Sequence, residues 1–128
     1  MILDSSALVA LAAREPGYEE VLAKLEAAER LGIGAPTLAE TGLVLEARLG
    51  IPAEPFLDRF LRAYAVQTIP FDDEHWREAI AAFRRFGRGR HSAALNFGDC
   101  LAYATARVAG EPLLFIGADF ARTDIDAA

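Results

Sequence analysis

Four acidic residues stand where a parallel β-sheet would bring their side chains together: Asp4, Glu40, Asp99 and Asp119. Asp4 and Asp119 each follow an apolar segment that is expected to form a strand. Glu40 and Asp99 each fall in the first turn of an expected helix. The carboxyl ends of parallel strands point to one edge of a sheet, and ligands bind at that edge. We therefore expect the four carboxylates to gather there, although they lie far apart in the sequence.

A group of carboxylates is unfavourable unless it takes up protons or binds a cation. Two like charges at about 4 Å repel each other by about 4 kcal/mol at an effective dielectric constant of about 20. The expected site offers oxygen ligands without cysteine or histidine, and such ligands suit Mg²⁺ or Mn²⁺ rather than Zn²⁺. Because Mg²⁺ also binds phosphate oxygens, the pattern favours hydrolysis of a phosphodiester bond by a bound water molecule.

Three of the acids also have a structural interpretation. Thr37 and Glu40 have the spacing of a capping box at the start of a helix. Asp99 follows the candidate helix cap Asn96 by three residues, so the same interpretation applies to it. Asp119 lies in an expected turn, where aspartate is common. A capping or turn role would explain each of them singly, so the functional interpretation depends on their joint placement.

The chain is acidic overall, with a net charge of −6, and this alone argues against binding to nucleic acid. The arginines are nonetheless clustered at Arg84, Arg85, Arg88 and Arg90, next to His91. No acid occurs between Glu78 and Asp99. Arginine binds phosphate in a bidentate manner, so this cluster is a candidate phosphate-binding segment at the rim of the acidic site. Arg84 and Arg85 have a structural alternative, because cations also stabilise the C-terminal end of a helix.

Short apolar segments alternate with amphipathic ones, which predicts an α/β fold around a parallel sheet. Strands are expected at residues 1–3, 33–35, 66–69 and 113–116. Helices are expected at residues 5–13, capped by Ser5 or Ser6, and at residues 18–30, 37–49, 54–64 and 97–109. Gly32 is expected to end the second of these helices. One more helix, capped by Asp72, carries the apolar stripe Trp76, Ile80 and Phe83.

Length and composition fit one globular domain over residues 1–128. Hydrophobic residues make up 53% of the chain and charged residues 25%, which excludes a disordered or collagen-like protein. Cys100 is the only cysteine, so no internal disulfide is available and a reducing compartment is expected. The first residues lack the basic region of a signal peptide, and no apolar run reaches the roughly 20 residues that span a bilayer. We therefore expect a cytoplasmic protein with no membrane partner.

Four segments together resemble the PIN-domain ribonucleases, and within that family the VapC toxins of bacterial toxin–antitoxin pairs. They are residues 1–8 (MILDSSAL), 35–40 (APTLAE), 93–103 (AALNFGDCLAY) and 113–120 (LLFIGADF). The resemblance extends over essentially the whole chain, and residues 93–103 are its most specific part. It implies a three-layer α/β/α sandwich with a central, mostly parallel sheet. It also implies Mg²⁺- or Mn²⁺-dependent endonuclease action on RNA.

The same resemblance implies roles for individual residues. Asp4 and Asp99 match the main metal-binding acids of the family, and Glu40 matches the second acid of its quartet. Asp119 matches a more variable acid, for which Asp124 is an alternative. The resemblance thus implies four residues that both bind the metal and take part in catalysis: Asp4, Glu40, Asp99 and Asp119. The residues expected to contact the substrate are Ser5, Ser6, Thr37, Arg88 and Arg90.

The resemblance further implies a homodimer and a small antitoxin partner that fills the groove and silences the enzyme. A non-cleaving RNA- or protein-binding module with the same fold is the main alternative. An aspartyl-phosphate phosphatase needs a second acid two residues after the first, where this chain has Ser6. A phosphoacceptor receiver domain needs a lysine after a late strand, but the only lysine is Lys24. Both of these classes therefore fit poorly.

Overall fold

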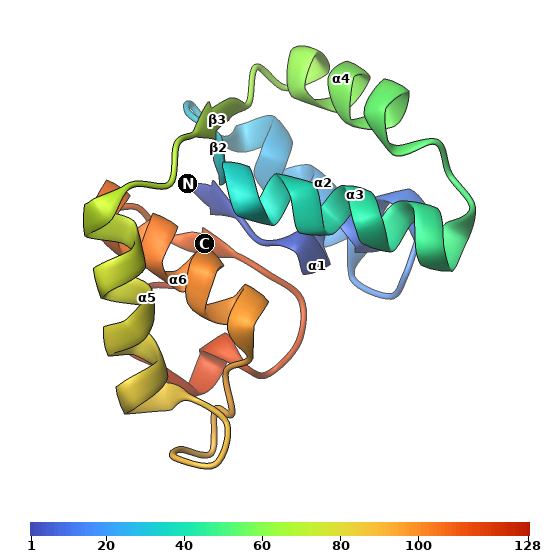
Figure 1. The fold of residues 1–128 in the computed structure, drawn as a ribbon. Helices are drawn as coiled ribbons and strands as arrows, with labels where there is room; N and C mark the ends of the chain where they lie inside the picture. The colour runs from blue at the N-terminus through green and yellow to red at the C-terminus, as the bar shows by residue number, and fades with distance from the viewer.

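A four-stranded parallel sheet runs through the centre of the molecule in the computed structural model, which describes residues 1–128 (Figure 1). The strands are β1 (Ile2–Leu3), β2 (Gly32–Gly34), β3 (Gln67–Ile69) and β4 (Leu113–Leu114), in the spatial order β3-β2-β1-β4. The helices are α1 (Ser5–Ala13), α2 (Tyr18–Ala27), α3 (Ala35–Leu49), α4 (Ala53–Ala63), α5 (Asp73–Phe86) and α6 (Phe97–Ala109), with a 3-10 turn at Phe120–Arg122. The expected class, an α/β fold with a parallel sheet between helices, is confirmed.

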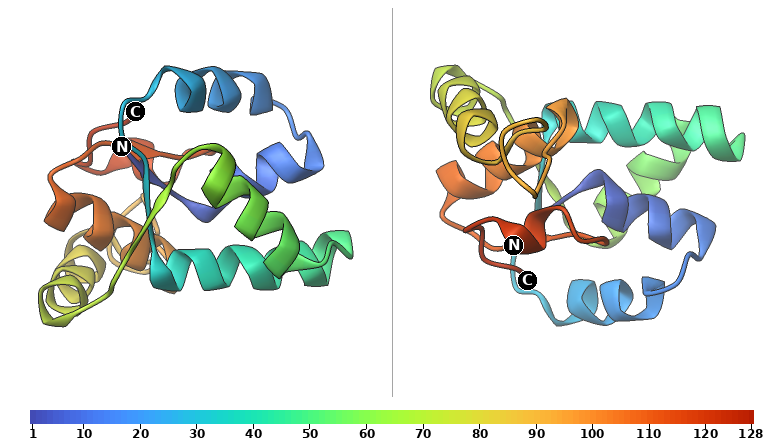
Figure 2. Two further views of the ribbon diagram at one scale, coloured as in Figure 1. Left: turned by 90° about the horizontal axis from the view of Figure 1, so that it is seen from above. Right: turned by 90° about the horizontal axis from the view of Figure 1, so that it is seen from below.

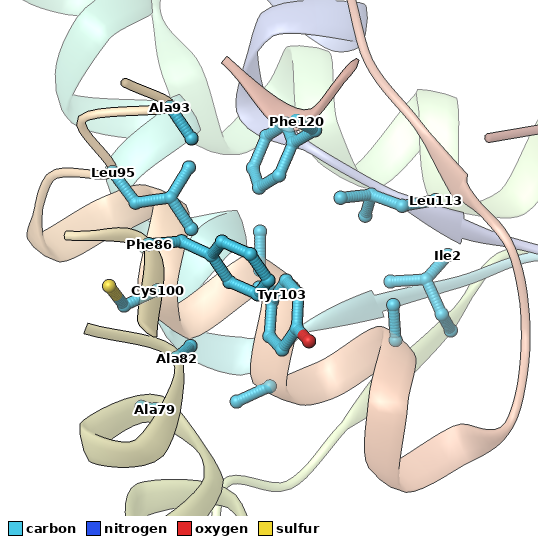
Figure 3. Close-up of a cluster of buried hydrophobic side chains, with 13 residues drawn as sticks. Ile2, Ala79, Ala82, Phe86, Ala93, Leu95, Cys100, Tyr103, Leu113 and Phe120 are labelled. Carbon is cyan, nitrogen blue, oxygen red and sulfur yellow. The ribbon is translucent and has the colours of Figure 1, made fainter. Parts of the chain in front are cut away.

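Each face of the sheet carries its own hydrophobic core, because successive strand residues point to opposite faces. Ile2 joins the core that α5 and α6 cover, whereas Leu3 joins the core formed with α1, α2 and α4. Figure 3 shows the first of these cores, where Phe86 of α5 and Tyr103 of α6 lie close together, with ring centroids 5.9 Å apart. Leu113 of β4 pairs with Ile2 in the sheet and points into the same core.

Strand order decides which segments meet at the carboxyl edge of the sheet. β1 lies between β2 and β4, and it leads directly into α1 through Asp4, whose backbone amide donates to Leu114 O at 2.9 Å. α3 follows β2 without a loop, and α6 packs against both β1 and α3. Figures 1 and 2 show α3 and α4 together at the end of the molecule away from α5. The starts of α1 and α3 and the residues after β4 therefore share one edge.

α3 begins two residues earlier than the sequence predicted. Its N-cap is Gly34, Pro36 lies in its first turn, and no side chain caps it. The predicted capping box of Thr37 and Glu40 is therefore wrong. Proline favours the first turn of a helix because its φ is already helical and its missing amide would have no partner there, so Pro36 sets the start.

The other differences concern the lengths of elements. α2 ends at Ala27, and Gly32 starts β2 instead of ending the helix before it. A Cβ on Gly32 would lie 2.8 Å from Ile69 Cδ1, so glycine allows the close approach of β2 and β3 at this point. β4 comprises two residues rather than the expected four. None of the helices meets the length and hydropathy that a membrane-spanning segment requires.

The apolar stripe of α5 does not face a core. Trp76, Ile80 and Phe83 are 42%, 44% and 41% exposed. The buried side of the helix is formed instead by His75, Ala79, Ala82 and Phe86. The helical period thus predicted the stripe correctly, but the structure leaves that stripe uncovered in the single chain.

Candidate active site

Asp4 stands at the C-terminal end of β1 and caps α1, a role that the sequence analysis assigned to Ser5 or Ser6. Its Oδ2 accepts hydrogen bonds from the backbone amide of Ser6 at 3.0 Å and from the Ser6 hydroxyl at 2.6 Å. The Ser6 hydroxyl also accepts the amide of Ile116 at 3.0 Å, which joins Asp4 to the segment after β4. Asp4 is only 5% exposed, and its Oδ1 is free of hydrogen bonds within the protein.

Glu40 lies in the second turn of α3, too far inside the helix to cap it. The Ser5 hydroxyl donates to Glu40 Oε1 at 2.8 Å. The carboxylate also lies against the backbone of α6, because a Cβ added to Gly98 would stand 2.8 Å from Glu40 Cδ. Glycine at this position therefore lets a carboxylate from α3 approach the first turn of α6, directly beside Asp99.

Asp99 lies in the predicted capping box at the start of α6. Its Oδ2 accepts the backbone amide of Asn96 at 2.9 Å, and Asn96 Oδ1 accepts the amide of Asp99 at 2.9 Å. The structural interpretation of Asp99 is thus confirmed. It uses only one carboxylate oxygen, so Oδ1 stays available to a ligand.

Asp119 and Asp124 differ in what holds them. Asp119 is exposed at the start of the 3-10 turn, and its side chain caps nothing. Asp124 accepts hydrogen bonds from the Tyr103 hydroxyl at 2.5 Å and from Arg85 at 2.6 Å. The Tyr103 hydrogen bond and the Arg85 charge hold the pKa of Asp124 below its usual range. The geometry therefore favours Asp119 over Asp124 as the fourth acid.

Electrostatics shows that the four acids share one region. Burial raises the pKa of Asp99 to about 6, and repulsion from the three other candidate acids adds to this rise. The pKa of Asp4 is also raised, mainly by burial and further by repulsion from Asp119, against the opposing hydrogen bonds from Ser6. The structure thus brings together carboxylates from the ends of β1 and β4 and from the early turns of α3 and α6.

A divalent cation fits this region by donor chemistry and by charge. The donors are carboxylate and hydroxyl oxygens, which Mg²⁺ and Mn²⁺ prefer, and a bound cation would relieve the repulsion that raises the pKa of Asp99. In the conformation described, no group of three or more His, Cys, Asp or Glu side chains is arranged to hold a metal ion. Three of the acids instead use one oxygen each for donors of the protein.

Gly98→Ala tests whether the placement of Glu40 matters. The new Cβ would displace the Glu40 carboxylate, and misplacement of a reacting group by about 1 Å can lower a rate by about 100-fold. We expect RNA cleavage to fall about 10- to 100-fold. The melting temperature should stay unchanged or rise, because alanine is favoured over glycine within a helix by up to about 1 kcal/mol.

Gly42→Ala is the matched control, since a Cβ there meets Ala53 and Leu57 at an ordinary 3.5 Å. Cleavage by both variants is measured beside their thermal unfolding. Unchanged cleavage by Gly98→Ala would show that the contact between α3 and α6 does not position Glu40 for function.

The structure places the residues expected to contact substrate in three kinds of environment. Arg88 and Arg90 are exposed in the loop after α5. Ser5 and Ser6 are half-buried and donate to the candidate acids, so they orient carboxylates. Thr37 is 2% exposed and its hydroxyl has no hydrogen-bond partner, so its contact with a substrate stays a prediction.

Two residues that decide how the candidate acids are placed were missed by the sequence analysis. A glycine in the first turn of a helix is costly, so Gly98 next to Asp99 carried a signal of close approach. Tyr103, which holds Asp124 together with Arg85, gave no signal in the sequence, because its position fits that of an ordinary core residue.

Comparison with known proteins places the chain in a family. It matches the PIN domain over residues 1–126. It is 43% identical to the VapC ribonuclease Mb0640 of Mycobacterium bovis, over 98% of this chain and 95% of that protein. The chain belongs to the PIN-domain family. This PIN domain is also 44% identical to ribonuclease VapC36 of Mycobacterium tuberculosis (98% and 91% covered) and 39% identical to ribonuclease VapC of Mycolicibacterium smegmatis (99% and 98% covered).

Solved structures agree on the fold. The crystal structure of Mycobacterium tuberculosis VapC20, described as a Sarcin-Ricin loop cleaving toxin, superimposes on this PIN domain with a TM-score of 0.80 at 17% identity. The match covers 99% of this chain and 97% of that one. A toxin–antitoxin complex from Klebsiella pneumoniae gives a TM-score of 0.70 at 19% identity, with 96% and 92% covered. The family and the α/β/α architecture inferred from the sequence are therefore confirmed.

Proposed function

We propose that residues 1–128 of this PIN domain form a single Mg²⁺- or Mn²⁺-dependent endoribonuclease domain, the toxin of a toxin–antitoxin pair. The observation that carries the proposal is the convergence of four carboxylates at the carboxyl edge of the sheet, where their repulsion adds to the effect of burial in raising the pKa of Asp99 to about 6. The ribonuclease names of relatives at 39–44% identity over almost their full length support the same activity.

In this proposal Asp4, Glu40, Asp99 and Asp119 hold the cation and form the catalytic group. A cation bound there neutralises charge on the scissile phosphate and makes an attacking water more acidic. Ser5 holds the Glu40 carboxylate, and the hydrogen bonds to Asp4 and Asp99 likewise leave one oxygen of each carboxylate free. The protein thus orients its carboxylates before any ligand arrives, which lowers the cost of ordering them.

RNA is the substrate because the loop that carries Arg88 and Arg90 leads into the start of α6, where Asp99 lies. Arg84, Arg88 and Arg90 are exposed, and none of them forms an ion pair with an acid of the chain. Their guanidinium groups are therefore available to phosphates on either side of the scissile bond.

We place the enzyme in the cytoplasm, where RNA is present and where Cys100, the lone buried thiol, stays reduced. A homodimer, implied by the family resemblance, stays a prediction.

The antitoxin partner is supported by a groove between α3 and α4. It is a hollow of about 570 Å³ with apolar residues along its floor, among them Leu38 and Leu57, and with Leu43 on its rim at 73% exposure. Glu46, Glu54 and Asp58 also line it, so an antitoxin segment that combines apolar and basic residues suits it. A toxin–antitoxin complex is among the structures that share this fold.

Metal dependence tests the proposal. The purified protein is expected to cleave RNA internally when Mg²⁺ or Mn²⁺ is present and to lose that activity in excess EDTA, with recovery when the ion is restored. Cleavage products are followed on denaturing gels with end-labelled RNA. Binding of RNA without cleavage under either metal would instead support the non-cleaving binding module, and cleavage in EDTA would refute the role of the carboxylates.

A further inference from the structure

The arginine loop, residues 87–95, lies between α5 and α6 and carries Arg88 and Arg90 at its exposed tip. Two buried side chains fix the base of the loop, since Ala93 and Leu95 are only 1% and 0% exposed. The amide of Arg88 also donates to Leu95 O at 3.0 Å, which joins the two sides of the loop. The base of the loop therefore belongs to the core, whereas its tip lies in solvent.

The tip, residues 88–92, has little to fix its position relative to the rest of the protein. All five of its residues are exposed, and Gly89 has a φ of +80° that favours glycine. The amides of Arg90 and His91 both donate to Gly87 O, at 3.0 and 3.1 Å. With one exception, the hydrogen bonds of the tip stay within the arginine loop in this way. They shape the tip but do not attach it to another element.

The exception is a hydrogen bond from Arg122, whose Nη1 donates to the backbone carbonyl of Ser92 at 3.0 Å across 30 positions of sequence. Arg122 is the last residue of the 3-10 turn Phe120–Arg122, and Asp119 directly precedes that turn. Arg122 forms no ion pair with an acid of the chain. This hydrogen bond therefore connects the tip that carries two arginines to the turn that carries the candidate fourth acid.

The 3-10 turn is itself firmly held. Phe120 is 3% exposed, and Figure 3 shows it at the same end of the core as Leu95 at the base of the arginine loop. Just beyond the turn, Asp124 accepts hydrogen bonds from Tyr103 and Arg85. Because the turn is fixed on both sides of Arg122 and the tip is not, the hydrogen bond restrains the tip.

We infer that Arg122 is a positioning residue for RNA, which orders Arg88 and Arg90 on the Asp119 side of the site before RNA binds. This inference rests on the proposed function. A loop that is ordered in advance loses less conformational entropy on binding, so affinity rises without a further contact to the ligand. Without the hydrogen bond to Ser92, the tip samples other positions, and its two arginines bind phosphates at a higher entropic cost.

RNA binding in the absence of cleavage tests this role. A short single-stranded RNA of mixed sequence, labelled with fluorescein, is titrated in EDTA at low ionic strength and followed by anisotropy. Arg122→Ala is expected to weaken binding by about 3- to 10-fold in the otherwise unchanged protein. In an Arg88→Ala/Arg90→Ala background the same substitution should change binding by less than about 2-fold, because no arginine of the tip is left to position.

Arg62→Ala is the matched control. It removes an exposed arginine of α4 that has no ion pair, with the same change in net charge. Any effect of this general kind should be equal in the two backgrounds. Thermal unfolding of each variant checks that the fold is intact, as expected for the loss of one exposed hydrogen bond.

Limited digestion with trypsin examines the restraint on the tip without RNA. Trypsin cleaves after arginine, and Arg88 and Arg90 are exposed in the tip. Cleavage of a folded protein requires local opening, so Arg122→Ala should accelerate the cuts after these two residues by about 2- to 10-fold. Arg62→Ala should leave the rate of these cuts unchanged. The fragments are identified and quantified by mass spectrometry.

The inference is overturned if Arg122→Ala weakens RNA binding equally in both backgrounds, since Arg122 would then bind a phosphate itself. It is also overturned if Arg122→Ala leaves either RNA binding or digestion of the tip unchanged, or if Arg88→Ala/Arg90→Ala alone leaves RNA binding unchanged. Failure of the proposed function gives a different result. A wild type that cleaves RNA with Mg²⁺, but shows no coupling between Arg122 and the tip, refutes the positioning role alone. A wild type that never cleaves, yet shows this coupling in RNA binding, refutes the nuclease and keeps the positioning role.

Discussion

Asp4→Asn and Asp99→Asn are each expected to lower RNA cleavage by at least about 100-fold, more than the loss of a residue that merely orients a metal ligand. Asparagine keeps a side-chain oxygen for the Ser6 donors at position 4 and for the Asn96 amide at position 99. It removes the negative charge and replaces the free oxygen, which a cation would bind, with an amide nitrogen. The fold should therefore survive, and initial rates of cleavage at a saturating Mg²⁺ concentration measure the loss.

Asp119→Asn and Asp124→Asn form a matched pair that identifies the fourth acid. Asp119 repels the acids of the site, whereas Asp124 is held by Tyr103 and Arg85. Cleavage is expected to fall with Asp119→Asn, while Asp124→Asn keeps its activity and loses some stability. Full activity of Asp4→Asn and Asp99→Asn would remove the basis of the proposed function, and the reverse outcome of the second pair would move the fourth role to Asp124.

Local signals in the sequence predicted the parts of the site that local interactions build. The capping box of Asn96 and Asp99 forms as expected, because both partners lie within one helical turn. The similar spacing of Thr37 and Glu40 was misleading, because Pro36 competes for the helix start and shifts it toward the N-terminus. The position of an acid directly after a strand predicted the site more reliably, since a parallel sheet directs the carboxyl ends of all its strands to one edge.

Contacts between distant segments could not be predicted from the sequence. Ser5 reaches Glu40 across 35 positions, and Gly98 admits the same carboxylate to α6, but no spacing rule connects these residues. The α5 stripe shows a second limit. The i, i+4, i+7 period is the same for a buried face and for an uncovered one, so only the fold reveals that Trp76 and Phe83 stay exposed.

Without a divalent cation, Asp99 is expected to destabilise the folded protein at neutral pH. Its pKa is about 6 in the folded state, against an ordinary value of 3.8. Between these two values the folded protein keeps a proton that the unfolded chain has lost. The contribution of Asp99 to the free energy of unfolding therefore decreases as the pH rises from about 4 to 6, and above pH 6 its full cost is present.

Asp99→Asn removes this cost because the amide is neutral at every pH and still caps α6 through its oxygen. In EDTA at pH 7 we expect the variant to be about 1–2 kcal/mol more stable than the wild type, a value reduced for the partial solvent screening of this group. Its melting temperature should rise by several degrees. Thermal and urea unfolding at pH 5 and pH 7 measure the effect, and the gain should be much smaller at pH 5.

Added Mg²⁺ should reverse this difference in stability, so that the wild type becomes more stable than Asp99→Asn. A cation stabilises the folded wild type by binding to it and not to the unfolded chain, and this gain declines below pH 6 because the Asp99 proton competes with the ion. Asp99→Asn should gain much less from Mg²⁺ at any pH. Asp126→Asn, which removes an exposed acid outside the site with the same change in net charge, controls for general charge effects. Equal stabilisation of all three proteins by Mg²⁺ would show that the ion does not bind at Asp99.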